Sequence, residues 1–340
     1  MLPGLLSRKT AIKKTNEVLY MKLGVINVPL SGMPFDEAMA YLASLGVQAV
    51  EIGCGGFPGN AHCDPEVLLH SKTELEKFKE VLRRNHLEIS ALGCHGNGVH
   101  PDKAVAQKAD REFRNAVLLA EKLGVGVVNT FSGCPGDCPD SRYPNWVTCP
   151  WPDDFGKILD YQWNGVLLPY WQDMAGYLND HGVRAALEMH PGFCVYGPES
   201  MLRLRAAVGG AVGANFDPSH LFWQGIDIPT ALIALKGAIY NFHAKDCYIN
   251  PANTARTGVL DTKPYADELG RSWLFRTMGY GHGADTWKQI VSTLRLCGFD
   301  GALAIEHEDS LMSIKEGLEK AVAFLKEVLI QEEPAAMWWA

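Results

Sequence analysis

The chain has 340 residues, 47% of them hydrophobic and 21% charged, and a formal net charge of −8. This is the composition of a globular protein with a large core. The acidic balance and the lack of a long Lys/Arg run argue against binding to nucleic-acid phosphates or to an anionic membrane. We therefore expect a cytoplasmic enzyme that acts on a small molecule, with no nucleic-acid and no membrane partner.

The first twenty residues are basic and lack the apolar core and cleavage site of a signal peptide. A transit peptide is one interpretation of this segment. An upstream start or an added extension is the simpler one, because Met21 opens the first clear strand pattern.

Short apolar runs alternate with amphipathic segments from residue 22 onward. The runs that we predict as strands are 22–28, 49–55, 88–96, 125–133, 183–191, 212–220, 239–246 and 301–309. Helix signals lie between them, such as Pro34 followed by Gly46 and the capping pair Ser71 and Glu74. Eight such units predict an α/β fold, a single (β/α)8 TIM barrel. An open doubly wound sheet is the alternative, although no GxGxxG follows the first strand.

We divide the chain into an N-terminal extension (1–20), the TIM barrel (21–331) and a C-terminal tail (332–340). Two long loops are predicted, after strand 4 (133–160) and after strand 7 (247–283). Long loops at the carboxyl ends of barrel strands commonly build the active site. The second loop carries basic residues that could hold a phosphate, namely Arg256, Lys263, Arg271 and Arg276.

The nine cysteines include three in the first long loop, Cys134, Cys138 and Cys149. A zinc site is one interpretation, but the spacing is not a usual ligand pattern and no fourth ligand is evident. Free thiols are the interpretation we favour. An odd number of cysteines without a secretory signal indicates a reducing compartment.

Four successive predicted strands end in a polar residue that could bind a metal. These residues are Glu188, Asp217, His243 and Glu306. Each alone could be a helix cap or a solvated charge. In a closed barrel the four strand ends are neighbours on one rim, so together they predict a metal site. Three carboxylates and one imidazole suit one divalent ion, with Mn2+ expected and Mg2+, Co2+, Zn2+ or Fe2+ as alternatives.

The segments "ALEMHPG", "FDPSH", "NFHAKD", "GYGHGADTW" and "AIEHED" resemble the xylose isomerase-like TIM barrel family, the sugar phosphate isomerase/epimerase superfamily. The resemblance runs from about residue 22 to 330. It implies one divalent metal held by Glu188, Asp217, His243 and Glu306. In the ketose 3-epimerase branch the two glutamates also move the proton, and the position of His220 contacts substrate oxygens.

This resemblance implies a divalent-metal-dependent isomerase or epimerase acting on a sugar or keto-sugar. A carboxylate removes a proton α to a carbonyl, and the cation stabilises the resulting enediolate. Glu188 and Glu306 are the expected catalytic residues. Further expected substrate contacts are Glu51, His95, Lys245 and His282. For the two histidines the alternative is a structural role, and for the lysine it is an exposed position.

The two long loops depart from simple 3-epimerases and leave a second reaction class open. This is a metal-dependent lyase or hydratase acting on 3-keto-glycosides or inososes, including a catalytic subunit of the C-glycoside deglycosidase type. An apurinic-site endonuclease would need more metal ligands and a basic groove, and a barrel that only binds sugar is a further alternative. We expect a homo-oligomer, with an accessory subunit as an alternative, and the apolar end of the tail could pack on a neighbour.

Overall fold

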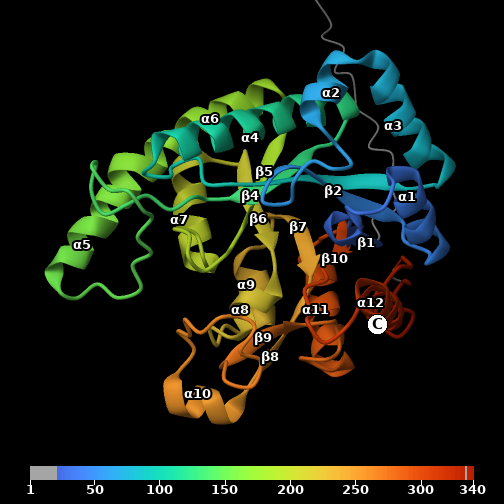
Figure 1. Cartoon of the computed structure of the whole chain (residues 1–340). Coiled ribbons are helices and arrows are strands. Elements are labelled where there is room, and N and C mark those ends of the chain that lie inside the picture. Colours follow the sequence, from blue (N-terminus) through green and yellow to red (C-terminus); the bar gives the residue numbers. More distant parts are fainter. Residues whose placement is uncertain (1–20, 334) are drawn as a thin grey trace, which may run out of the picture.

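The computed structural model describes residues 21–333 and 335–340, so the expected extension 1–20 lies outside the described residues. Eight parallel strands close into a barrel in the order β1-β10-β7-β6-β5-β4-β3-β2 (Figure 1). They are β1 (Lys22–Ile26), β2 (Ala49–Gly56), β3 (Glu88–His95), β4 (Val127–Phe131), β5 (Arg184–Glu188), β6 (Val212–Phe216), β7 (Ile239–Ala244) and β10 (Ala302–Ile305). The closed barrel confirms the predicted TIM-barrel fold and excludes the open sheet.

Several strands end earlier than predicted, and β6 shows why. The prediction ran to residue 220, but Asp217 is already the N-cap of a short helix with Pro218 at its first position. Proline has no backbone N–H for the strand ladder and suits the first turn of a helix. The carboxylate therefore lies at the barrel rim, where the strand changes into a helix.

Helices surround the barrel and connect its strands. They are η1 (Val28–Leu30), α1 (Phe35–Ser44), α2 (Pro65–His70), α3 (Lys72–Arg84), α4 (Lys103–Leu123), α6 (Leu168–Asp180), α7 (Pro198–Val208), α8 (Pro218–Phe222), α9 (Ile228–Ala234), α11 (Ala284–Leu296) and α12 (Ile314–Val328). The predicted cap of α3 is present, because the Ser71 side chain accepts a hydrogen bond from Glu74 N. One large apolar core fills the layer between the helices and the barrel.

The alternation of side chains along the strands sorts apolar from polar groups. Phe216 on β6 and Phe242 on β7 are fully buried and stack at 5.7 Å between ring centroids. Residues one position away point to the opposite face of a strand. Asn215, Asn241 and His243 therefore point into the barrel.

The segment after β4 is long, as predicted. Residues 132–152 contain no regular element and lead into α5 (Asp153–Asp160), a π-helical turn η2 (Tyr161–Leu167) and α6. In Figure 1, α5 projects to the left of the barrel. The buried Gln162 amide fixes this segment by donating hydrogen bonds to the carbonyls of Pro135, Gly136 and Asn145.

The segment after β7 is also long and carries its own small sheet. β8 (Asp246–Ile249) pairs antiparallel with β9 (Trp273–Arg276), and α10 (Pro251–Thr257) lies between them in sequence. Its predicted phosphate-binding residues have partners inside the protein: Arg276 contacts Glu268 at 2.5 Å, and Lys263 contacts Asp261 at 2.8 Å. The buried Arg271 guanidinium lies over the rings of Tyr265 and Trp273.

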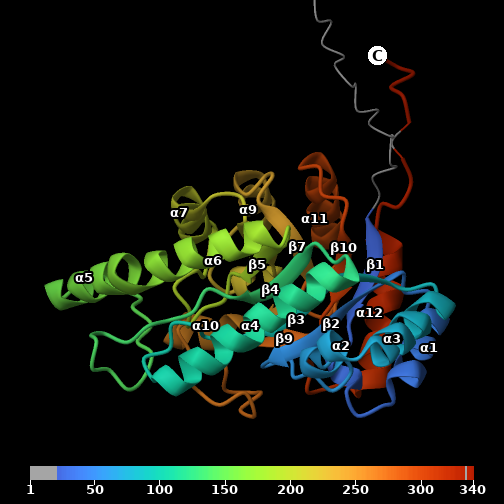
Figure 2. The ribbon, with the colours of Figure 1, turned by 90° about the horizontal axis from the view of Figure 1, so that it is seen from above.

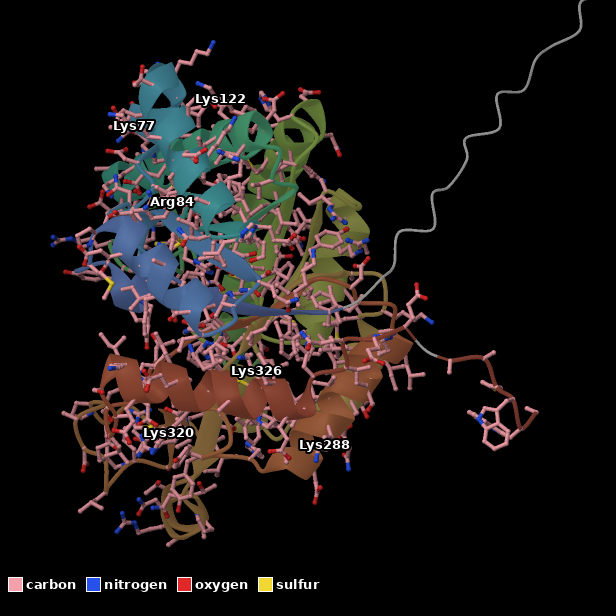
Figure 3. All side chains as sticks on the ribbon, turned by 90° about the vertical axis from the view of Figure 1, so that its right-hand side faces the viewer. Lys77, Arg84, Lys122, Lys288, Lys320 and Lys326 are labelled. Carbon is pink, nitrogen blue, oxygen red and sulfur yellow. The ribbon has the colours of Figure 1, made fainter. Side chains whose placement is uncertain are left out.

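Figure 3 shows a face on which six basic side chains are labelled. Four pair with carboxylates of Asp36, Glu74, Glu316 and Glu327. The other two, Lys122 and Lys326, donate to backbone carbonyls. These six positive charges are thus engaged within the protein.

At the end of the chain, residues 335–340 run away from the barrel (Figure 2), and Met337, Trp338 and Trp339 are exposed. Across the described part of the chain, no helix has the length and apolar character needed to cross a membrane.

Candidate active site

A polar layer crosses the inside of the barrel from β2 to β7. Asn241 Nδ2 donates hydrogen bonds to Glu51 Oε2 at 2.9 Å and to Asn215 Oδ1 at 3.0 Å. His243 Nε2 also lies 3.0 Å from Glu51 Oε2. Glu51 thereby fixes the orientation of the His243 ring, whose Nδ1 atom faces Glu306 at 3.0 Å and Glu188 at 3.5 Å.

Glu188 is buried at the end of β5 and is surrounded by imidazoles. Its Oε1 atom lies 3.0 Å from His220 Nε2, and its Oε2 atom lies 3.1 Å from His95 Nε2. Burial alone would raise the pKa of Glu188, but the hydrogen bond with His220 and the proximity of His95 lower it well below its usual range. Glu188 is therefore an ionised carboxylate, and each of its two oxygens faces an imidazole ring.

Lys245 follows β7 and is buried among acidic groups. Its Nζ atom lies 3.5 Å from Asp217 Oδ2, 3.2 Å from Glu306 Oε1 and 2.8 Å from Glu308 Oε2. Burial opposes its charge, but these carboxylates raise the pKa of Lys245 well above its ordinary value. The predicted alternative of an exposed lysine is wrong, because only 2% of Lys245 is exposed. Its ammonium group offsets part of the negative charge at the barrel mouth.

Three of the predicted metal ligands lie together, and the fourth stands slightly apart. Glu188, His243 and Glu306 each offer a ligand atom, and these atoms lie within 4.8 Å of one another. Asp217 Oδ1 accepts a hydrogen bond from Ser219 N, and its Oδ2 atom is buried without a hydrogen bond. Burial raises the pKa of Asp217 to about 7.

The donor set fits a divalent cation. Glu306 Oε2, like Asp217 Oδ2, is buried and outside hydrogen-bond geometry, so both oxygens have lone pairs to offer. Carboxylate and imidazole ligands suit Mn2+, Mg2+, Co2+, Zn2+ or Fe2+. Asp217 is not part of the group of three, and the Lys245 ammonium contacts both Asp217 and Glu306. The four-ligand site therefore stays a prediction.

A second group of candidate ligands shares Glu188 with His190 and His220. Both groups found among the described residues consist of Glu and His only. The cysteines of the loop after β4 are free thiols, with Cys134 buried and Cys138 and Cys149 exposed.

Glu188, His243 and Glu306 line a pocket of about 420 Å³ at the barrel mouth, whereas the fully buried Asp217 does not. Of the predicted substrate contacts, Glu51, His95 and Lys245 line this pocket. His220 contacts Glu188 but does not line the pocket, and it is buried. Burial and the neighbouring His190 lower the pKa of His220 to about 3. A larger cavity of about 730 Å³ lies between the loop after β4, α7 and α9, and none of the predicted site residues lines it.

His282 is not among the residues that line the pocket. Its Nδ1 atom lies 2.8 Å from Asp246 Oδ1, and its ring stacks on Phe222 at 3.7 Å between centroids. Asp246 Oδ2 also accepts hydrogen bonds from the backbone of Gly279, Gly281 and His282. The structure thus gives His282 a role in the turn before α11, and its predicted substrate contact stays a prediction.

Several residues of the site were not predicted from the sequence. Asn215 donates a hydrogen bond to Glu188, and Asn241 donates one to Glu51. Glu308 pairs with Lys245, and Phe57 and Phe131 line the pocket. The two asparagines had a signal, because each interrupts an apolar strand ("GANF", "YNF").

Comparison with known proteins supports the barrel fold and shows the family. The protein YfiH of Bacillus subtilis (strain 168) is 35% identical over 315 residues, which are 92% of this chain and 100% of YfiH. Among solved structures, a D-psicose 3-epimerase crystallised in the presence of D-fructose shares the fold at a TM-score of 0.60. It is 15% identical, and the match covers 91% of this chain and 99% of the epimerase.

A second structure, from Mycobacterium smegmatis, is a xylose isomerase-like TIM barrel protein in complex with magnesium. It has a TM-score of 0.59 and 16% identity, over 91% of this chain and 98% of the other. The family model described as xylose isomerase-like TIM barrel matches residues 39–328. The chain therefore belongs to the xylose isomerase-like TIM barrel family, as its strand-end motifs predicted.

Proposed function

We propose that this protein is a divalent-metal-dependent isomerase or epimerase of a sugar or keto-sugar. The observation that carries the proposal is the placement of two glutamates, Glu188 and Glu306, beside His243 Nδ1 in one pocket of the barrel mouth. The members of the xylose isomerase-like family share this barrel, and ligands of TIM barrels bind at the carboxyl ends of the strands. Glu188, Asp217, His243 and Glu306 are the proposed ligands, with Mn2+ as the proposed ion.

When bound, the cation supplies a Lewis acid for the negative charge that develops on the substrate oxygens. Glu188 is the proposed base, because it is ionised and its carboxylate is oriented by His220 and His95. Glu306, a second carboxylate in the same pocket, is the proposed proton carrier for the other face of the planar intermediate. Lys245 Nζ, 3.2 Å from Glu306 Oε1, donates a hydrogen bond to a substrate oxygen in this scheme.

The test is proton exchange with solvent. The full chain is loaded with Mn2+ and incubated in D2O with a panel of ketoses, and deuterium at the α carbon is followed by NMR. We expect exchange with the unaltered protein, and a loss of about 10²–10⁴-fold in Glu306→Gln, the usual contribution of a positioned acid or base. Glu80→Gln, on the exposed face of α3, is the matched control.

If the protein holds a stoichiometric metal but exchanges no proton with any ketose of the panel, the isomerase proposal fails. Full exchange by both Glu188→Gln and Glu306→Gln would leave the pocket in place but remove the roles assigned to these two residues.

A lyase or hydratase is the second candidate, and Lys245 is the observation that favours it. A buried ammonium group that lines the pocket can donate a hydrogen bond to a departing oxygen at the β carbon and offset the negative charge that develops there. In that case 3-keto-glycosides or inososes release an alcohol or water. The same D2O experiment, with a 3-keto-glycoside and an inosose added to the panel, separates the two reactions, since epimerisation retains every substituent and elimination loses one.

A further inference from the structure

Another cavity, of about 520 Å³, adjoins the catalytic pocket. We call it the side pocket. Phe57 and His95 line both cavities, so the two spaces meet at these residues. Beyond them the side pocket is walled by Val105 on α4 and by Pro144 and Phe193 from the loops after β4 and β5.

An aromatic partition separates the two spaces. Phe131 faces the catalytic pocket and Phe193 faces the side pocket. Their rings stack at 4.2 Å between centroids with an interplanar angle of 18°. His95 packs edge-on against Phe131 at 4.8 Å. A ligand that extends from the carboxylates toward α4 would thus pass along aromatic rings.

Backbone features hold this junction in place. Gly56 has a φ of +62°, and a Cβ atom there would lie 2.0 Å from the carbonyl oxygen of His95. Only glycine fits this position. The next residue, Phe57, donates its backbone N–H to the same oxygen at 2.8 Å. The exposed Phe57 ring is therefore carried on a fixed backbone at the border of the two cavities.

The long loop after β4 is fastened to the same place. Asn97 Nδ2 donates a hydrogen bond to the Cys134 carbonyl at 2.9 Å, and Asn97 Oδ1 accepts one from Cys134 N at 3.1 Å. This loop contributes Cys134 and Pro144 to the wall of the side pocket. The extra length of this loop, which a simple barrel does not need, therefore forms part of the wall of the side pocket next to the active site.

Several polar groups of the side pocket already have partners. Lys108 contacts Glu112 at 2.7 Å, and Glu112 also accepts a hydrogen bond from Gly56 N. His100 Nδ1 accepts one from Asp102 N at 2.9 Å. A second sugar ring needs donors and acceptors for its hydroxyl groups, whereas an apolar ring needs only surface to cover.

We propose that the substrate has two parts, a keto-sugar in the catalytic pocket and an aromatic substituent in the side pocket, as in an aryl keto-glycoside. The sugar part of this inference rests on the proposed function. The side pocket itself is an aromatic-ring site between α4 and the Phe131–Phe193 stack. A free ketose would leave the side pocket empty, and the loop after β4 would contribute nothing to its binding affinity.

The test uses Val105→Trp, which places an indole in the side pocket from a position that is 44% exposed and therefore tolerant of a larger side chain. Val67→Trp on α2, 45% exposed and outside both cavities, is the matched control. The Mn2+-loaded full chain is titrated by calorimetry with 4-nitrophenyl β-D-glucopyranoside, methyl β-D-glucopyranoside, D-fructose and 4-nitrophenol. The melting temperature of each variant confirms that it is folded.

We expect the 4-nitrophenyl glycoside to bind at least tenfold more tightly than the methyl glycoside. Val105→Trp should remove this advantage and weaken 4-nitrophenol at least tenfold, and leave D-fructose within twofold. Equal binding of 4-nitrophenol to Val105→Trp and Val67→Trp, or no binding to the unaltered protein, would overturn the inference. Loss of 4-nitrophenol binding in Val105→Trp, with no sugar bound by any variant, would support the side pocket and refute the proposed sugar chemistry.

Discussion

The two halves of the barrel mouth end in different chemistry. β5, β6, β7 and β10 lead into Glu188, Asp217, His243 and Glu306, and Lys245 lies among them. β2, β3 and β4 lead into Phe57, His95 and Phe131, which face the side pocket or its partition. We call the first group of strand ends the charged rim and the second group the aromatic rim. Because one barrel carries both, we infer that the charged rim is suited to chemistry and the aromatic rim to binding an aromatic part of the substrate. Substitutions on each rim test this division.

The largest effect is expected for Glu188→Gln on the charged rim. The amide keeps the shape of the side chain but cannot accept a proton, so turnover should fall by about 10³-fold, roughly 4 kcal/mol of transition-state stabilisation. Glu327→Gln on α12, whose carboxylate is exposed, should keep full turnover. Metal content is measured in parallel, so that loss of the ion and loss of the base can be told apart. A variant with full metal and full turnover would contradict the assignment.

Metal binding should stabilise the charged rim. At a Mn2+ concentration about 100 times the Kd, the free energy of unfolding should rise by about 2.7 kcal/mol, because only the folded chain assembles the ligands. Thermal unfolding with Mn2+ and after addition of EDTA measures this difference. Asp217→Asn should reduce the shift, whereas Phe131→Leu should not. An EDTA-insensitive melting temperature at every Mn2+ concentration would argue against a metal site here.

Glu51→Gln tests whether a residue from the half of the barrel that carries the aromatic rim contributes to metal binding on the charged rim. Glu51 belongs to β2, yet its carboxylate holds His243 Nε2 at 3.0 Å and Asn241 Nδ2 at 2.9 Å. Residues that orient a ligand commonly contribute about 10–100-fold to metal affinity, so we expect a loss of this size, roughly 1.4–2.7 kcal/mol. Calorimetric titration with Mn2+ measures it, with Glu80→Gln as the control. An unchanged Kd would mean that the His243 ring is positioned without Glu51.

The charged rim could be predicted from sequence because its signal is local. An acid or imidazole at the end of an apolar strand is visible in segments such as "ALEMHPG" and "NFHAKD", and the βα rhythm places these ends side by side. The prediction for His282 shows the limit of such reasoning. Its ring is held by Asp246, which is 36 residues away in sequence and lies in a strand outside the barrel.

The aromatic rim could not be predicted in the same way. Phe131 and Phe193 meet only because β4 and β5 are neighbours and the loops after them fold toward each other. Residues 132–152 have no periodicity from which their path could be read. Hydrogen bonds from Gln162 and Asn97 determine that path, and neither contact leaves a local pattern in the sequence.

The smallest effect is expected for Phe131→Leu on the aromatic rim. Leucine keeps the site apolar but loses the stack with Phe193 and the edge-on contact with His95. Aromatic pairs contribute about 0.5–1.5 kcal/mol beyond the area they bury, so KM for an aryl keto-glycoside should rise by about two- to twelvefold while turnover stays nearly unchanged. Phe155→Leu, on α5 and exposed, is the control for the same exchange elsewhere. If turnover instead dropped by about two orders of magnitude while KM stayed the same, the aromatic rim would take part in the chemical step, and the division between the two rims would no longer hold.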